Sequence, residues 1–279
     1  MSAWLPMAPC TPHDCAGHRG ERRAPLSAAA LLFAGCALTL LGVLCVPGVL
    51  LLGAAGRDRL VRGWAYTVVR AFGVRVRVTG LPETAPRAPA GELVVANHVS
   101  WLDIPLVAAV LPARMVAKSE IRTWPLLGPL AALGGTLFIE RDRLRALPAA
   151  VRSVAAALGS GSRVAVFPQG STWCGRSTGG RFRPAAFQAA IDAGAAVRPV
   201  RIRYRTADMG TAGAAAFVGD DPLAASLWRV VTAAGLTAEI SVLAPIPAGG
   251  EPDRRSLARA AQSAVARDSA NLPAESVHH

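Results

Sequence analysis

The sequence lacks the features that mark nucleic-acid-binding proteins and disulfide-rich secreted proteins. It has no run of clustered lysines, its arginines are scattered, and it has only two tyrosines, which together argue against nucleic acid as a partner. The five cysteines are odd in number, and two of them lie in an apolar stretch, so no disulfide framework is indicated. His13 and His18 lie near Cys10 and Cys15, but nothing around them predicts a fold that would hold tetrahedral ligands, and we expect no metal.

The usual signatures of a covalent nucleophile are also missing. There is no G-x-S-x-G elbow, and Gly159-Ser-Gly-Ser162 is better interpreted as a turn into the next strand. Cys174 has no histidine near it in sequence, and His98 is the one histidine of the region that we expect to fold. If His98 is catalytic, it most simply deprotonates a substrate hydroxyl directly.

Charged residues are absent from Ala24 to Gly56. This stretch exceeds the ~20 residues that span a bilayer once but is short for two full passes. Pro47-Gly48 interrupts it, and arginines flank both of its ends: Arg19, Arg22, Arg23, Arg57, Arg59 and Arg62. Symmetric positive flanks favour a shallow helical hairpin that enters and leaves by the cytoplasmic face, with a single span as the alternative. Hydrophobicity continues too far beyond Pro47 for a cleaved signal peptide.

These features predict four regions. Residues 1–26 form a disordered basic tail, 27–56 a membrane-embedded helical segment, 57–268 one domain, and 269–279 a C-terminal tail. Hydrophobic residues make up 52% of the chain, and its formal net charge is +12. That charge suits an anionic lipid surface, phosphorylated substrates, and a coenzyme A or carrier-protein donor. We therefore expect a membrane protein on the cytoplasmic face of the plasma (inner) membrane.

Beyond Arg57, short apolar runs alternate with helical periods. Seven strands are predicted: Val74–Thr79, Leu93–Ala96, Arg114–Ala117, Thr136–Ile139, Arg163–Phe167, Val197–Tyr204 and Ala238–Leu243. Apolar residues recur at helical spacing from Leu144 to Leu158, before Gly159, and a second helix is expected from Pro184 to Gly194. This alternation predicts an α/β fold with a largely parallel central sheet flanked by helices.

The most informative segment runs from Leu93 to Pro105. An apolar strand leads into Asn97-His98, and Asp103 follows just before a helix that tolerates Pro105 in its first turn. A carboxylate folded back onto the imidazole would fix its tautomer and leave the other nitrogen free to accept a proton. The alternative is that Asp103 only caps the helix, or forms a capping box with Ser100.

Four segments in series resemble the PlsC-type glycerolipid acyltransferase family over roughly residues 60–245. Asn97-His98-Val-Ser-Trp-Leu-Asp103 is similar to the N-H-x-x-x-x-D block, and Gly135-Thr-Leu-Phe-Ile-Glu-Arg141 to G-x-x-F-I-x-R. Phe167-Pro-Gln-Gly-Ser-Thr172 resembles F-P-E-G-T-R, and Val197-Arg-Pro-Val200 resembles V-x-P-V. Ala117-Lys118-Ser-Glu120 between the first two blocks also matches the family.

The resemblance implies the reaction and the roles of residues. His98 and Asp103 would be the catalytic pair, and the acyl group would pass from acyl-CoA or an acyl-carrier protein to a lysolipid hydroxyl, without metal or other cofactor. The resemblance further implies substrate-binding residues: Asn97, Lys118, Arg141, Phe167, Pro168, Gln169, Gly170, Ser171, Thr172 and Pro199. A guanidinium such as that of Arg141 matches phosphate oxygens, although a surface ion pair is the alternative.

The third block departs from the family pattern at two positions. Gln169 replaces the usual glutamate, and Thr172 stands where many members have arginine. These changes bear on the acceptor more than on the reaction, because His98 and Asp103 are intact. Lysophosphatidic acid, giving phosphatidic acid, is the default acceptor. The alternatives are another lysolipid such as lyso-ornithine lipid, or a catalytically silent lipid-binding member of the family.

Overall fold

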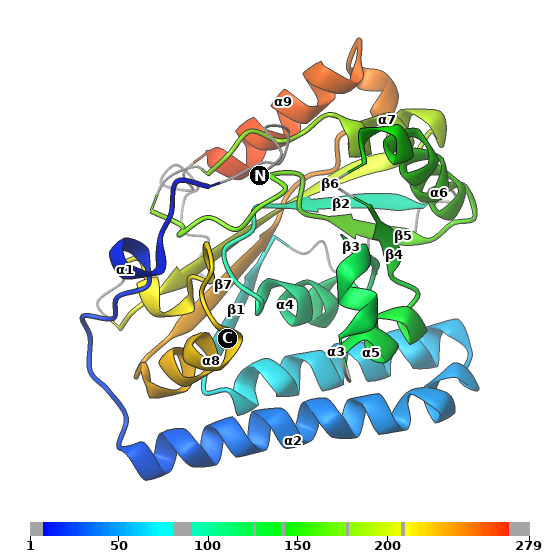
Figure 1. The fold of residues 1–279 in the computed structure, drawn as a ribbon. Coiled ribbons are helices and arrows are strands. Elements are labelled where there is room, and N and C mark those ends of the chain that lie inside the picture. The colour runs from blue at the N-terminus through cyan, green and yellow to red at the C-terminus, as the bar shows by residue number, and fades with distance from the viewer. Residues whose placement is uncertain are drawn as a thin grey trace, which may run out of the picture.

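One seven-stranded sheet forms the centre of the protein (Figure 1). The computed structural model describes residues 8–80, 91–124, 127–140, 143–176, 179–207 and 210–267. The strands are β1 (Arg75–Thr79), β2 (Glu92–Ala96), β3 (Arg114–Lys118), β4 (Leu137–Ile139), β5 (Arg163–Val166), β6 (Ala196–Arg205) and β7 (Thr237–Val242). All seven predicted strands are present, with ends that differ by at most one residue.

The sheet is largely parallel, as predicted. Its strand order is β1-β7-β6-β2-β5-β3-β4, and every pairing is parallel except that of β6 with β7. The strands β2, β5, β3 and β4 therefore end at the same edge. The loops that follow β2 and β5 carry the segments resembling the first and third family blocks, so the topology brings these two segments to one edge of the sheet. The segment resembling the second block contains β4 itself.

Helices cover both faces of the sheet (Figure 1). The α-helices are α1 (Pro12–Cys15), α2 (Pro25–Leu50), α3 (Ala54–Ala71), α4 (Asp103–Val110), α5 (Leu127–Leu133), α6 (Leu147–Gly159), α7 (Ala185–Asp192), α8 (Leu223–Thr232) and α9 (Arg254–Ala266). Leu93 and Val95 of β2 face the core beneath α6, α7 and α9, whereas Val94 and Ala96 face the core beneath α3, α4 and α8. The central strand is thus buried on both sides, as its continuous apolar run indicates.

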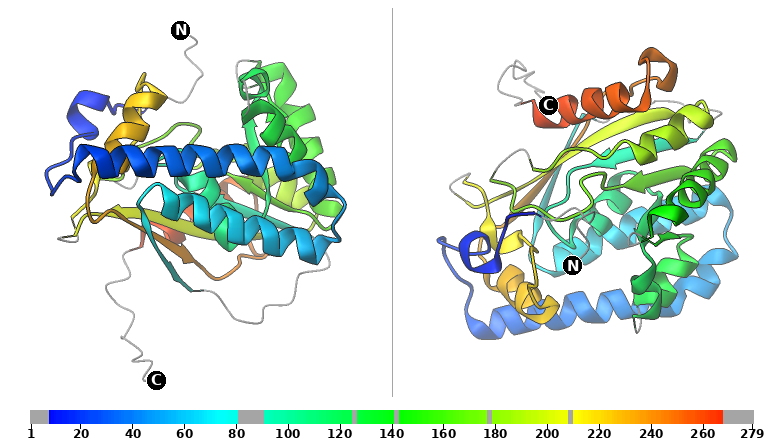
Figure 2. Two further views of the ribbon diagram at one scale, coloured as in Figure 1. Left: turned by 90° about the horizontal axis from the view of Figure 1, so that it is seen from below. Right: turned by 45° about the horizontal axis from the view of Figure 1, so that its top comes forward.

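The uncharged stretch forms one continuous helix, α2, which packs beside α3 as a helical hairpin (Figures 1 and 2). Pro47 lies inside α2, so the interruption expected at Pro47-Gly48 does not occur, and the chain turns back only at residues 51–53. The second arm is the arginine-bearing α3. Gly35 and Gly42 allow close packing, because a Cβ there would lie 2.5 Å from the Phe72 ring and 2.3 Å from the Trp64 indole.

The N-terminal segment packs against the domain from Ala8 onward, which differs from the expected disordered tail. Thr11 caps α1, and Cys15 at its end is buried. The Arg23 guanidinium donates to the carbonyls of Val231 and Ala233 at 2.8 and 2.6 Å, which holds the start of α2 to the end of α8. The predicted C-terminal tail, 269–279, lies outside the described residues.

Candidate active site

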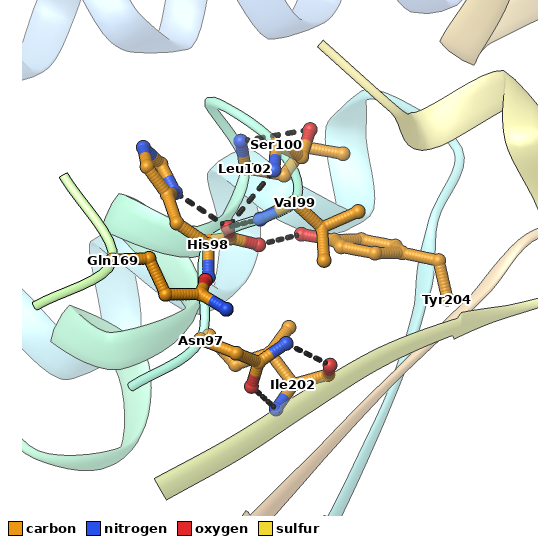
Figure 3. A network of polar contacts seen from close by, with 9 residues as sticks. Asn97, His98, Val99, Ser100, Leu102, Gln169, Ile202 and Tyr204 are labelled. Atoms are coloured by element: carbon orange, nitrogen blue, oxygen red, sulfur yellow. Dashed lines mark hydrogen bonds and ion pairs between the residues drawn. The ribbon is translucent and has the colours of Figure 1, made fainter. Parts of the chain in front are cut away.

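The site is built around His98, which follows the buried strand β2. The first turn of α4 begins five residues later at Asp103, whose side chain turns back toward the strand. The distance from His98 Nδ1 to Asp103 Oδ2 is 2.8 Å (Figure 3). The five-residue spacing therefore does bring imidazole and carboxylate into contact.

Asp103 is fully buried and surrounded by hydrogen-bond donors. Its Oδ2 also accepts from the backbone N–H groups of Val99 and Ser100, at 2.6 and 2.9 Å, and its Oδ1 accepts from the Tyr204 hydroxyl at 2.7 Å. The bond from Ser100 is half of the capping box considered above. One carboxylate thus organises the loop and holds the histidine, so the two interpretations of Asp103 are compatible.

This network determines which nitrogen of His98 carries the proton. The carboxylate oxygen beside Nδ1 already accepts two backbone N–H groups, so it acts as an acceptor and Nδ1 is the donor. Nε2 is then left with a lone pair. The imidazole stacks on the Phe167 ring, with centroids 4.1 Å apart, and the side chain remains 21% exposed. Such a histidine is oriented, supported from behind, and open to a substrate proton.

Tyr204 is a member of this network that the sequence did not reveal. It lies near the end of β6 and is only 3% exposed. Burial first, and then the charge of Asp103 and the hydrogen bond to it, raise the pKa of the Tyr204 hydroxyl well above its ordinary value. The hydroxyl therefore stays protonated and donates. The one feature of the sequence that could have indicated this role is the position of Tyr204 at the end of a predicted strand.

The Phe167–Thr172 turn lies against His98. Gln169 is 2% exposed; its Oε1 accepts from the backbone N–H of His98 at 2.8 Å, and its Nε2 donates to the Gly180 carbonyl at 3.3 Å. Gly170 has a φ of +76°, a value that favours glycine in this turn. The backbone N–H of Trp173 donates to the His98 carbonyl at 2.8 Å. Gln169 thus takes a positioning role at this turn.

The other residues of the Phe167–Thr172 turn differ in burial and in hydrogen bonding. Phe167 supplies the stacked ring, and Pro168 is buried, with its carbonyl accepting from the Arg183 N–H at 2.9 Å. The Ser171 Oγ is buried and has no hydrogen-bond partner among the described residues. Thr172 is half-buried.

Other predicted substrate-binding residues lie in different surroundings. Asn97 uses its whole amide to bridge strands: Nδ2 donates to the Ile202 carbonyl and Oδ1 accepts the Ile202 N–H, both at 2.8 Å. Pro199 is buried within the sheet, in register with Val95. Lys118 is exposed at the end of β3. Arg141 lies outside the described residues.

Comparison with known proteins identifies the family. The family described as Acyltransferase matches residues 75–203. A lyso-ornithine lipid O-acyltransferase of Pseudomonas aeruginosa is 42% identical over 209 residues, which cover 75% of this chain and 78% of that protein. The chain belongs to the PlsC-type glycerolipid acyltransferase family. The expected reaction class, an O-acyltransferase, follows from this membership.

Two further relatives of this acyltransferase are informative. A 1-acyl-sn-glycerol-3-phosphate acyltransferase of Neisseria meningitidis is 38% identical, over 72% of this chain and 77% of that protein. The crystal structure of the 1-acyl-sn-glycerophosphate acyltransferase PlsC from Thermotoga maritima shares the fold, with a TM-score of 0.67 and 20% identity over 87% of this chain and 92% of that one. The relatives' names thus carry both acceptors considered from the sequence.

Proposed function

We propose that this acyltransferase esterifies a lysolipid hydroxyl with His98 as general base. Nε2 takes the proton of the acceptor hydroxyl, and the oxygen attacks the carbonyl carbon of a bound thioester. The C–S bond then breaks, and the leaving thiolate takes the proton back from the imidazolium. The thioester is already activated, so the ester forms without a covalent enzyme intermediate.

The observation that carries this proposal is the position of Asp103. A fully buried carboxylate 2.8 Å from Nδ1 favours the imidazolium that forms when Nε2 takes a proton. Asp103 bonds Nδ1, which leaves Nε2 for the substrate, so proton transfer and support occur on different nitrogens of the ring. If Asp103 only capped α4, its role would not require a partly exposed histidine that stacks on the Phe167 ring.

Lysophosphatidic acid remains the default acceptor. Arg183 lies beside the Phe167–Thr172 turn, because its N–H donates to the Pro168 carbonyl, and its side chain is exposed. It offers a cation for a phosphate where Thr172 offers none. Arg141 would be a second cation on the basis of the family resemblance.

Lyso-ornithine lipid is the second candidate acceptor, favoured by a specific observation. Thr172 carries no charge, and the Arg176 guanidinium donates to the Asp14 carbonyl at 2.9 Å on the N-terminal segment. Three arginines follow this turn, Arg176, Arg181 and Arg183. With Arg176 bonded to the N-terminal segment, Arg181 and Arg183 are left to replace the family's arginine. A site with fewer cations suits an acceptor without a phosphate monoester.

The enzyme would hold this site at a membrane surface through α2. From Pro25 to Val49, α2 is long and apolar enough to cross a bilayer, and only 6% of its most apolar window is buried within the protein. Packing with α3, α5 and α8 keeps it along the domain, which favours a helix lying in the membrane surface over a single span. Exposed Trp124, in the segment beside α5, and Trp228, on α8, suit an interface. We place the domain on the cytoplasmic face, where acyl-CoA and acyl-carrier protein occur.

A lysolipid panel tests the proposed function. Purified full-length protein in vesicles is given labelled acyl-CoA or acyl-carrier protein with lysophosphatidic acid, lyso-ornithine lipid or lysophosphatidylcholine. We expect an esterified product with one of the first two acceptors. Transfer to none of the acceptors from either donor would contradict the proposal, and transfer to lyso-ornithine lipid alone would remove the default acceptor.

A further inference from the structure

Three cysteines that are far apart in sequence meet beside the active-site loop. Cys10 precedes α1, Cys15 ends it, and Cys174 follows the Phe167–Thr172 turn by two residues. Their three Sγ atoms all lie within 4.8 Å of one another. Cys15 and Cys174 are buried, and the buried side chains of Ala216 and Val218 pack around them.

We propose that Cys10, Cys15 and Cys174 bind a thiophilic metal ion, with Zn2+ as the first candidate. Thiolate sulfur is a preferred ligand of zinc, at a Zn–S distance of about 2.3 Å, which places the sulfurs of a tetrahedral site about 3.8 Å apart. Three Sγ atoms within 4.8 Å need to approach one another by no more than about 1 Å to reach that geometry. Small rotations about the Cα–Cβ bonds supply such a shift.

The three thiols lie in different electrostatic environments. Burial raises the pKa of Cys15 to about 11, and burial also raises the pKa of Cys10. Burial acts in the same direction on Cys174. There it is outweighed by the Arg176 backbone N–H, by the neighbouring thiols and by the Arg176 charge, so the pKa of Cys174 is lowered. Binding of a metal ion by these cysteines would release their protons.

The surrounding backbone holds the two segments in place. The Arg176 guanidinium donates to the Asp14 carbonyl at 2.9 Å, which ties the Cys174 loop to α1. Gly213 packs so closely on α1 that a Cβ would lie 2.6 Å from the Cys15 carbonyl oxygen. Cys174, but neither Cys10 nor Cys15, also lines a cavity of about 400 Å³. His13 points elsewhere, because its side chain is 97% exposed and bonded to Asp14.

The consequence of metal binding is a fixed N-terminal segment and a fixed active-site loop. The backbone N–H of Trp173, the residue before Cys174, donates to the His98 carbonyl. A metal held by all three thiolates would link α1 to this loop and order both. The site lies beside the catalytic network and does not depend on the acceptor lipid.

Metal binding to the full-length protein tests the proposal directly. Protein purified with reductant and stripped with EDTA is titrated with Zn2+ alone, and bound zinc is measured by elemental analysis after gel filtration. We expect one zinc per chain, at least tenfold weaker binding in Cys10→Ser, Cys15→Ser and Cys174→Ser, and slower proteolysis of the N-terminal segment when zinc is bound. Cys36→Ser and Cys45→Ser, which alter the cysteines of α2, are the matched controls and should bind as the wild type does.

Three results would overturn the proposal. The first is no zinc retained by the wild type, and the second is equal retention by the wild type and Cys174→Ser. The third is a disulfide between two of the three cysteines, seen as a loss of two hydrogens by mass spectrometry, in reductant-purified protein that holds no metal. If the serine variants fail to fold, Co2+ titration of the wild type decides, because thiolate-to-cobalt charge-transfer absorption reports three sulfur ligands and its absence contradicts them.

Discussion

Among the residues, Asp103 has the most constrained environment. Its two oxygens accept four hydrogen bonds, from His98, Val99, Ser100 and Tyr204, at a position closed to solvent. Each donor aimed at a buried carboxylate stabilises its charge, and loss of one leaves an oxygen underpaired. The position of the His98 ring therefore depends on groups that never touch the substrate.

The Tyr204 hydroxyl should matter to turnover through Asp103 alone. In Tyr204→Phe, Oδ1 loses its donor, and we expect the free energy of unfolding to fall by about 1–3 kcal/mol and kcat by about tenfold, with KM nearly unchanged. Steady-state kinetics and thermal unfolding measure both. Tyr66→Phe is the control, because Tyr66 is the other tyrosine of the chain and is exposed. A kcat in Tyr204→Phe equal to that of the wild type would contradict the positioning role.

Gln169 is suited to its surroundings as an amide. A glutamate there would keep the bond from the His98 N–H but would turn its second oxygen toward the Gly180 carbonyl, within a site that is 2% exposed. We expect Gln169→Glu to lower the free energy of unfolding by about 1–3 kcal/mol and to leave activity the same or lower. Thermal unfolding and lysolipid acylation check this. A large gain in activity would instead support the silenced family member considered above.

Among the elements, the features that depend on a local sequence pattern were predicted from the sequence. The contacts between residues far apart in sequence were not. The strands follow from apolar runs between turn residues, and the His98–Asp103 contact follows from a five-residue turn between β2 and α4. Tyr204 meets Asp103 across 101 residues of sequence, and Cys174 meets Cys15 only through the path of the loop after β5. No local pattern encodes such contacts.

The hairpin of α2 and α3 was misjudged for a related reason. Pro47 and Gly48 disfavour a helix locally, yet α2 continues through them to Leu50, and the proline, which has no N–H, costs the helix one backbone hydrogen bond. The second arm, α3, carries arginines on its exposed side and buries Ala65, Val68 and Val69. Its amphipathic pattern indicates packing against the domain, and not membrane insertion on all sides.

Because this hairpin is closely packed, alanine should lower the free energy of unfolding at Gly42 but not at Gly48. In Gly42→Ala, the new Cβ would overlap the Trp64 indole, whose Nε1 donates to the Leu38 carbonyl at 3.0 Å. We expect the free energy of unfolding in detergent to fall by about 1–3 kcal/mol, since overpacking forces the indole to move. Gly48→Ala is the control, because nothing lies within 4 Å of its position. Equal melting temperatures for the two variants would contradict this packing.

Considering the whole molecule, one side of α2 presents an apolar surface that the domain leaves uncovered. Phe33 and Leu44 are each 76% exposed, and their eleven-residue separation places them on the same side of the helix. An exposed apolar face of this kind is typical of a membrane-binding surface. Cationic groups on α3, such as Arg57 and Arg62, are exposed and would add attraction to anionic lipid.

Vesicle flotation tests this membrane surface. We expect Phe33→Asp combined with Leu44→Asp to reduce the fraction of protein that floats with anionic vesicles at least tenfold, because two charges would have to enter the apolar layer. Leu147→Asp is the control, since Leu147 is exposed on α6 at the opposite face of the sheet. Equal flotation of both variants would contradict membrane binding through α2.

The direct test of the central proposal is turnover of His98→Ala beside the wild type, on whichever lysolipid the panel selects. Removal of the base from a folded protein should lower kcat by about 10²- to 10⁴-fold. The change should leave the melting temperature and vesicle flotation near their wild-type values, because the imidazole is partly exposed and α2 is untouched. A His98→Ala enzyme that acylates its lysolipid at the wild-type rate would contradict the mechanism.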